Sequence, residues 1–80
     1  MNAEQLKILR EMRNNDIICS HHLTIDTLKH YLPRKDRGKI NAIMKELVKL
    51  GYIEKHPTNH GMCYAIARGK VAEIEKLLSL

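Results

Sequence analysis

The spacing of apolar residues changes at Gly51, and this change restricts the chain to a mixed α+β fold. Before it, apolar residues recur along one face of a helix that we expect over residues 37–50. After it, residues 52–56 and 62–67 favour strands, and residues 57–61 between them favour a turn. The sequence therefore predicts a helix followed by a β-hairpin with a five-residue tip. The helical stripe consists of Ile40, Ile43, Met44, Leu47 and Leu50.

Both ends of this helix carry specific signals. Gly51 suits the left-handed position just past a helix, and Tyr52 is placed to close back onto Leu47 in a Schellman motif. Upstream, Pro33 ends the preceding helix because proline disfavours helical geometry in the residue before it. Pro33 to Asp36 then forms a tight turn, with Asp36 as the expected N-cap.

Two helices and a short strand are expected before that turn, and one helix after the hairpin. Asn2 caps a helix over residues 3–14, and the β-branched run at residues 17–19 suits a small strand. Thr24 is the expected N-cap of the second helix. Apolar residues at helical spacing predict a final helix over about residues 70–79.

A chain of 80 residues forms a single domain, residues 1–80. So small a core leaves little room for an enclosed substrate pocket. The only serines are Ser20 and Ser79, and the four glycines are isolated, so neither a nucleophile set nor a phosphate-binding loop is evident. We therefore expect a protein that is not an enzyme and has no cofactor.

The basic excess is confined to the middle of the chain. Residues 29–55 carry eight basic and three acidic side chains, which accounts for the whole net charge of +5. A field concentrated over one third of a small domain favours a polyanionic partner, with double-stranded nucleic acid the commonest candidate. A solubilising surface is the alternative explanation of the same charge.

No apolar stretch approaches the length of a membrane span, and Glu4 and Lys7 interrupt the N-terminal region where a signal peptide needs its apolar run. We therefore expect a cytoplasmic protein with no membrane partner. Cys19 and Cys63 form no disulfide framework and are expected to remain thiols in a reducing compartment.

The expected elements follow the order helix, short strand, helix, tight turn, longer helix and hairpin. The longer helix and the hairpin are marked by Leu47–Ile53, preceded by Ile40 and Met44 and followed by Gly61 and Tyr64–Ile66. This pattern resembles the winged helix-turn-helix family of DNA-binding domains, over residues 3–68. The resemblance implies an α+β fold with a three-helix core, a small antiparallel sheet whose hairpin is the wing, and a C-terminal helix. It also implies that the helix at 37–50 reads the DNA major groove while the wing at 57–61 contacts the backbone or an adjacent groove.

The outward face of the 37–50 helix has side chains suited to such a role. Gly38 and Ala42 are small enough to allow a close approach to DNA, Asn41 suits an adenine edge, and Arg37 suits guanine or phosphate. Lysines near a helix C-terminus are also favoured by the helix dipole alone. The candidate DNA-binding residues are Arg37, Gly38, Asn41, Ala42 and Lys45 for reading, Arg34, Lys35 and Lys49 for phosphates, and Lys55 and His60 in the wing.

The expected function is that of a small transcriptional regulator that binds duplex DNA. The alternative is a winged-helix adaptor in a larger assembly, whose basic face serves an acidic protein partner, because the fold alone does not decide function.

The sequence also contains cysteines and histidines of the types that bind zinc. If the strand after the first helix joins the hairpin, Cys19, His21 or His22, His60 and Cys63 approach one another as a zinc-type donor set. Their spacing matches no established zinc motif, and buried cysteines are common for packing reasons alone. We expect no metal.

The final helix carries more apolar residues than it needs in order to pack against so small a domain. Apolar patches that remain exposed on a protein mark surfaces for a partner. We expect a symmetric homodimer through this helix, which sets two reading helices about 34 Å apart on a palindromic site. The alternative is that the helix completes the core of a monomer. The residues concerned are Val71, Ile74, Leu77, Leu78 and Leu80.

Overall fold

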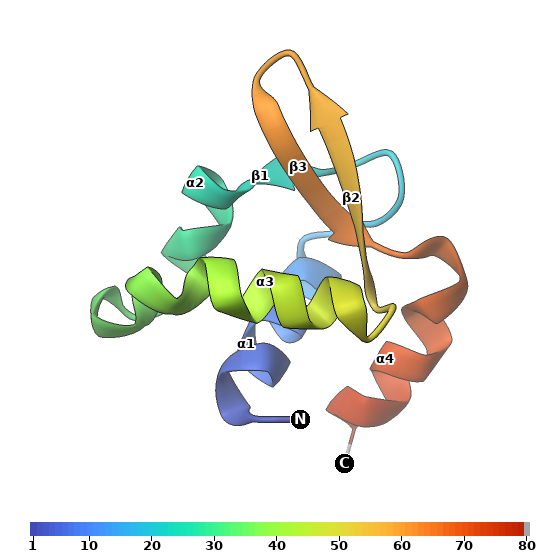
Figure 1. Cartoon of the computed structure of the whole chain (residues 1–80). Coiled ribbons are helices and arrows are strands. Elements are labelled where there is room, and N and C mark those ends of the chain that lie inside the picture. The colour runs from blue at the N-terminus through green and yellow to red at the C-terminus, as the bar shows by residue number, and fades with distance from the viewer. Residues whose placement is uncertain (80) are drawn as a thin grey trace.

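The protein is α+β, with four α-helices and one three-stranded antiparallel sheet (Figure 1). The structure is a computed structural model and describes residues 1–79. The elements are α1 (Ala3–Asn14), β1 (Leu23–Thr24), α2 (Ile25–Leu28), α3 (Ile40–Lys49), β2 (Ile53–Thr58), β3 (Gly61–Ile66) and α4 (Val71–Leu78), with 3₁₀ turns at Lys29–Tyr31, Arg34–Lys39 and Arg68–Lys70.

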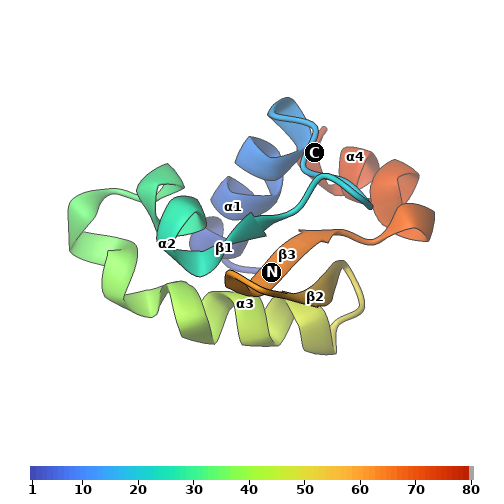
Figure 2. The ribbon, with the colours of Figure 1, turned by 90° about the horizontal axis from the view of Figure 1, so that it is seen from above.

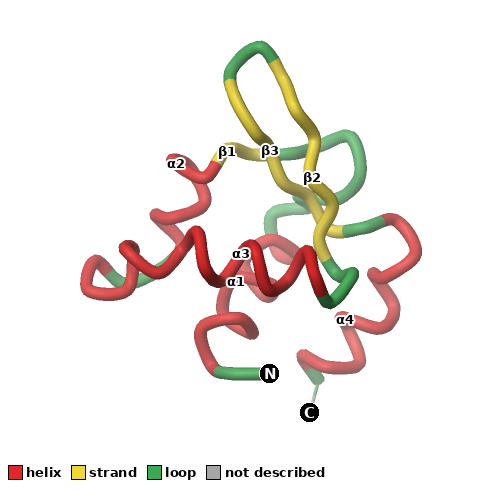
Figure 3. The backbone as a smooth tube through the Cα atoms, viewed as in Figure 1, coloured by secondary structure: helices red, strands yellow, loops and turns green. Residues whose placement is uncertain are grey.

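The sheet has the strand order β1-β3-β2, and the β2–β3 hairpin extends well beyond the helices (Figure 3). Viewed from above, the hairpin lies between α3 and the pair formed by α1 and α4 (Figure 2). In the hairpin register Lys55 is opposite Tyr64, and His56 is opposite Cys63. Because side chains alternate along a strand, these two pairs lie on opposite faces of the sheet.

The first helix forms as its sequence predicts. Asn2 accepts a hydrogen bond from the Gln5 backbone at 2.9 Å, and the Gln5 side chain accepts one from the Asn2 backbone at 3.0 Å. This reciprocal capping box satisfies two backbone donors that a helix end otherwise leaves unpaired. The predicted helix over residues 3–14 is confirmed.

The strand predicted at residues 17–19 is wrong. Asp16 and Cys19 have φ values of 54° and 56°, so the backbone turns at both positions instead of extending. Ile18 makes only a single parallel bridge with Ile66. The strand that joins the hairpin comes later, at β1, where Leu23 pairs with Tyr64.

The second helix is shorter than expected, and α3 begins three residues later than the helix predicted over residues 37–50. Thr24 is the N-cap of α2 by position, but its side chain makes no capping hydrogen bond. The Asp36 amide donates to the Pro33 carbonyl at 2.8 Å, so Asp36 lies inside a 3₁₀ segment and does not cap α3. The α-helix therefore begins at Ile40 and not at Arg37.

The Schellman motif after α3 is confirmed. Gly51 has a φ of 86°, its amide donates to the Val48 carbonyl at 3.0 Å, and the Tyr52 amide donates to the Leu47 carbonyl at 3.1 Å. The chain therefore reverses directly into the hairpin. Leu50, expected on the buried stripe, is 48% exposed.

The hairpin tip has two residues, Asn59 and His60, and the five-residue tip is wrong. Thr58 stabilises the tighter turn, because its hydroxyl donates to the Gly61 carbonyl at 2.7 Å and accepts from the His60 amide at 3.1 Å. Pro57 is tolerated in β2 because β2 is an edge strand, where a missing donor costs little.

One hydrophobic core joins the three longer helices and the sheet. Leu28 of α2 and Leu32 complete it near the turn that leads to α3. Because one face of α3 packs into this core, its opposite face points away from the core. The principal members are Ile8, Leu9 and Met12 from α1, Ile40, Ile43, Met44 and Leu47 from α3, Ile53, Ala65 and Ile66 from the sheet, and Ile74 from α4.

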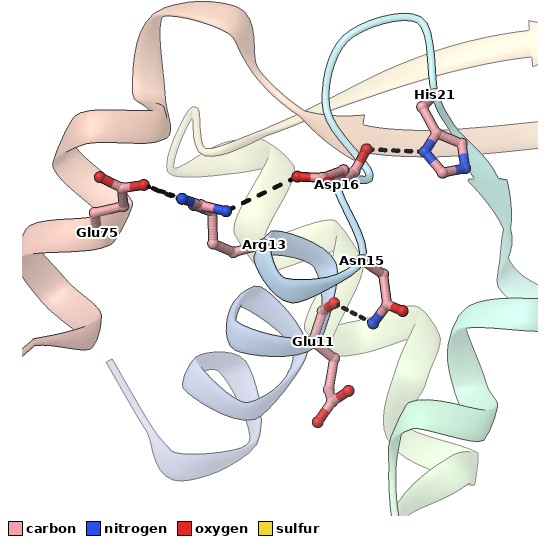
Figure 4. A network of polar contacts seen from close by, with 6 residues as sticks. All are labelled: Glu11, Arg13, Asn15, Asp16, His21 and Glu75. Atoms are coloured by element: carbon pink, nitrogen blue, oxygen red, sulfur yellow. Dashed lines mark hydrogen bonds and ion pairs between the residues drawn. The ribbon is translucent and has the colours of Figure 1, made fainter.

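Polar contacts fasten α4 to the end of α1 (Figure 4). Arg13 Nε donates to Glu75 Oε1 at 2.7 Å, and another guanidinium nitrogen lies 3.9 Å from Asp16 Oδ1. The Asp16 carbonyl in turn lies 2.8 Å from His21 Nδ1. Near this network the Asn15 side-chain nitrogen Nδ2 donates to the Glu11 carbonyl at 2.7 Å. Helix α4 and the loop before β1 therefore share one attachment to α1.

The apolar residues of α4 are largely covered by the same domain. Ile74 is fully buried, and Val71, Leu77 and Leu78 are half-buried. Leu80, which the dimer prediction also used, lies outside the described residues. Among residues 1–79, no helix combines the length and apolarity that crossing a membrane requires.

Candidate nucleic-acid interface

The outward face of α3 follows from the burial of its inner face. Ile40, Ile43, Met44 and Leu47 are all buried. With a 100° turn per residue, Asn41, Ala42, Lys45 and Lys49 then face away from the core. The structure leaves all four exposed. Four of the candidate reading and phosphate-binding residues are therefore accessible along one helix face.

Basic side chains divide into two groups by their ion pairs. Five of the fourteen pair with a carboxylate within residues 1–79: Lys7, Arg13, Lys29, Lys39 and Lys70. None of the six basic candidates has a carboxylate within 4.0 Å in that part of the chain: Arg34, Lys35, Arg37, Lys45, Lys49 and Lys55. The charge of the candidate face is therefore available to an outside partner.

Lys39 shows the contrasting case within the same segment. Its Nζ lies 3.1 Å from Glu4 and 3.7 Å from Asp36. The hydrogen bond that Lys39 donates to Glu4, then the charges of Glu4 and Asp36, raise the pKa of Lys39. Lys39 thus links the 3₁₀ segment to α1, and its charge is paired with carboxylates of the same chain.

The 3₁₀ segment before α3 carries four of the candidates. Arg34, Lys35 and Gly38 are exposed, whereas Arg37 is half-buried. Arg37 Nε donates to the Leu32 carbonyl at 3.3 Å, so its guanidinium is held against the preceding turn. A Cβ built on Gly38 meets no atom within 4 Å, so internal packing does not require a glycine at this position.

A hollow of about 270 Å³ lies between α3 and the hairpin. Asn41, Lys45 and Val48 line it from α3, while Lys55 and Tyr64 line it from β2 and β3. Three candidates from two elements, Asn41 and Lys45 of α3 and Lys55 of β2, therefore meet at one place. Tyr64 was not among the sequence candidates for binding, and it lies there because it is opposite Lys55 in the register.

The hollow also differs from the other surface hollows in charge. Four other surface hollows are each lined by at least one carboxylate: Glu54 in one, Glu75 in a second, Glu4 with Asp36 in a third and Glu4 in a fourth. The hollow between α3 and the hairpin has two lysines and no carboxylate. Its lining therefore suits an anion.

The wing tip is separate from this hollow. His60 is exposed at the two-residue turn, and Gly61 beside it has a φ of 110°, which a glycine adopts without strain. Lys55 lies within β2 and not at the tip.

The possible metal donors do not come together. His21 contacts the Asp16 carbonyl, His60 lies at the tip, and Cys63 pairs with Thr24 in the sheet. Within residues 1–79 no three His, Cys, Asp or Glu side chains form a group able to hold a metal ion.

Cys19 and His22 instead line a hollow of about 560 Å³ on the other face of the hairpin. The rings of His22 and His56 stack there, with their centroids 5.1 Å apart. On the same side of the sheet, a hydrogen bond with Cys19 raises the pKa of Arg68. Glu54 and Ser20 complete the lining. This hollow contains both charge signs, unlike the one beside α3.

The hollow between α3 and the hairpin is thus lined by two exposed lysines, Lys45 and Lys55, that form no ion pair within residues 1–79. Among known proteins, no family model, no curated protein and no solved structure matches the chain.

Proposed function

We propose that the chain is a winged helix-turn-helix domain that binds duplex DNA and acts as a small transcriptional regulator. The element order supports the fold, since α1, β1, α2 and α3 precede a hairpin that pairs with β1. The observation that carries the function is the row of unpaired cations on the α3 face, which continues onto the hairpin without a carboxylate in the hollow between them.

In this proposal α3 enters the major groove, where base edges present distinguishable patterns. Asn41 is the base-reading side chain, because its amide both donates and accepts, as an adenine edge requires. Arg34, Lys35 and Lys49 flank the helix and bind phosphates, which position the protein without reading sequence. The exposed His60 at the wing tip contacts the backbone or the adjacent groove.

The test is a titration of the full chain against fluorescently labelled random-sequence duplex at several salt concentrations. Each phosphate neutralised makes log K fall with log salt by about 0.9. We expect an affinity that falls steeply between 50 and 200 mM salt, on the order of tenfold or more for several phosphate contacts. Absence of duplex binding at the lowest salt contradicts the proposal and favours the adaptor alternative.

A further inference from the structure

The hollow between α3 and the hairpin offers four hydrogen-bonding side chains to a ligand. Lys45 and Lys55 supply ammonium groups, Asn41 an amide and Tyr64 a phenol. None of the side-chain hydrogen bonds or ion pairs formed within residues 1–79 uses any of them. These groups therefore remain free to bind an outside oxyanion.

The size and walls of the hollow restrict what that ligand is. At about 270 Å³ it lies below the roughly 300–1,000 Å³ typical of pockets that enclose drug-sized molecules, so it suits one anionic group of a larger partner. Val48 supplies an apolar wall between the polar groups.

We propose that this hollow holds one phosphodiester of the DNA backbone, bound jointly by Lys45 of α3 and Lys55 of β2, with Tyr64 donating a neutral hydrogen bond. The inference deepens the proposed function and depends on it. A phosphodiester is favoured over the carboxylate of an acidic peptide because the hollow adjoins the exposed Lys49 on the same helix face, so that cations continue along a line that a repeating backbone occupies.

Sharing one phosphate has a measurable consequence. The salt dependence of binding counts the phosphates that are neutralised. If two lysines neutralise the same phosphate, removing either one leaves that phosphate largely neutralised, and only removing both releases it. If they bind different phosphates, the two effects add.

The experiment measures random-duplex affinity by fluorescence anisotropy across a salt series for Lys45→Ala, Lys55→Ala and the double variant. We expect each single change to lower the slope by well under half a unit and the double change to lower it by about 0.9. Tyr64→Phe removes only a neutral donor, so it should weaken affinity about tenfold without changing the slope. Lys76→Ala, which removes an exposed charge from α4, is the matched control and should change neither quantity.

The outcomes separate the two proposals. If the wild-type chain does not bind duplex DNA, the proposed function fails. If it binds with a salt slope, but each single lysine change lowers that slope by about 0.9 and the double by about 1.8, the lysines bind separate phosphates and the shared site is wrong. Equal slopes in the double variant and the wild type also overturn it. Thermal melts should be unchanged in the lysine variants, because both side chains are exposed.

Discussion

Gly38→Ala is expected to make the protein more stable and at the same time weaken its binding to DNA. Gly38 lies in the 3₁₀ segment that leads into α3, and its φ is not in the positive range that favours glycine. A Cβ built there meets nothing within 4 Å. Alanine is therefore accommodated without strain, and its main effect on stability comes from restricting the unfolded chain.

The size of the stability change follows from that argument. A glycine-to-alanine change at a compatible position stabilises by about 0.4–1 kcal/mol. For a domain of this length, a change of 1 kcal/mol shifts Tm by roughly 4–8 °C, so Tm should rise by about 2–8 °C. If the backbone at Gly38 approaches the base pairs closely, the added methyl group separates the two surfaces, and duplex affinity should fall.

Gly69→Ala is the matched control for this prediction. Gly69 also lies in a 3₁₀ turn, has no positive φ, and leaves open space around an added Cβ, but it is outside the α3 face. It should raise Tm by a similar amount and leave DNA affinity unchanged. Circular-dichroism melts and anisotropy titrations measure the two quantities. Equal affinity for Gly38→Ala and the wild type would refute a close backbone approach at this position.

Three further outcomes are expected. Asn41→Ala should cost about 1–3 kcal/mol on a preferred duplex selected from a random pool and little on random duplex, whereas equal losses on both would remove its base-reading role. Thermal melts with and without EDTA should superimpose, because the core is formed by apolar side chains, and a large drop in midpoint with chelator would reveal a structural metal. Because Val71, Leu77 and Leu78 are only half-buried in a single chain, α4 retains apolar surface for a second copy. Sedimentation should show a species heavier than 9.3 kDa that grows with concentration and is lost in Leu77→Glu, and a constant 9.3 kDa in both proteins would exclude the homodimer through α4.

Local signals in the sequence predicted the helix ends where side chains or glycine determine them directly. The capping box at Asn2 and the left-handed Gly51 are both set by neighbouring residues, and both form as expected. Asp16 ends the run Asn14–Asp16, whose residue types tolerate turns, whereas no local signal marks the positive φ of Cys19. The surrounding packing stabilises these conformations: the Cys19 amide donates to the Ile66 carbonyl at 3.1 Å, and residue 66 lies 47 positions away in sequence.

The α3 face could be predicted from helical periodicity alone, since burial of one side fixes the other. The hollow beside it could not, because it depends on hairpin register. A tip of five residues between His56 and Met62 sets those two opposite each other, whereas the two-residue tip sets His56 opposite Cys63. A slip of one residue moves side chains to the other face of a sheet. Only the tighter turn stabilised by Thr58 brings Tyr64 to the same face as Lys55. The proposed phosphate site therefore depends on a turn that contributes none of its side chains.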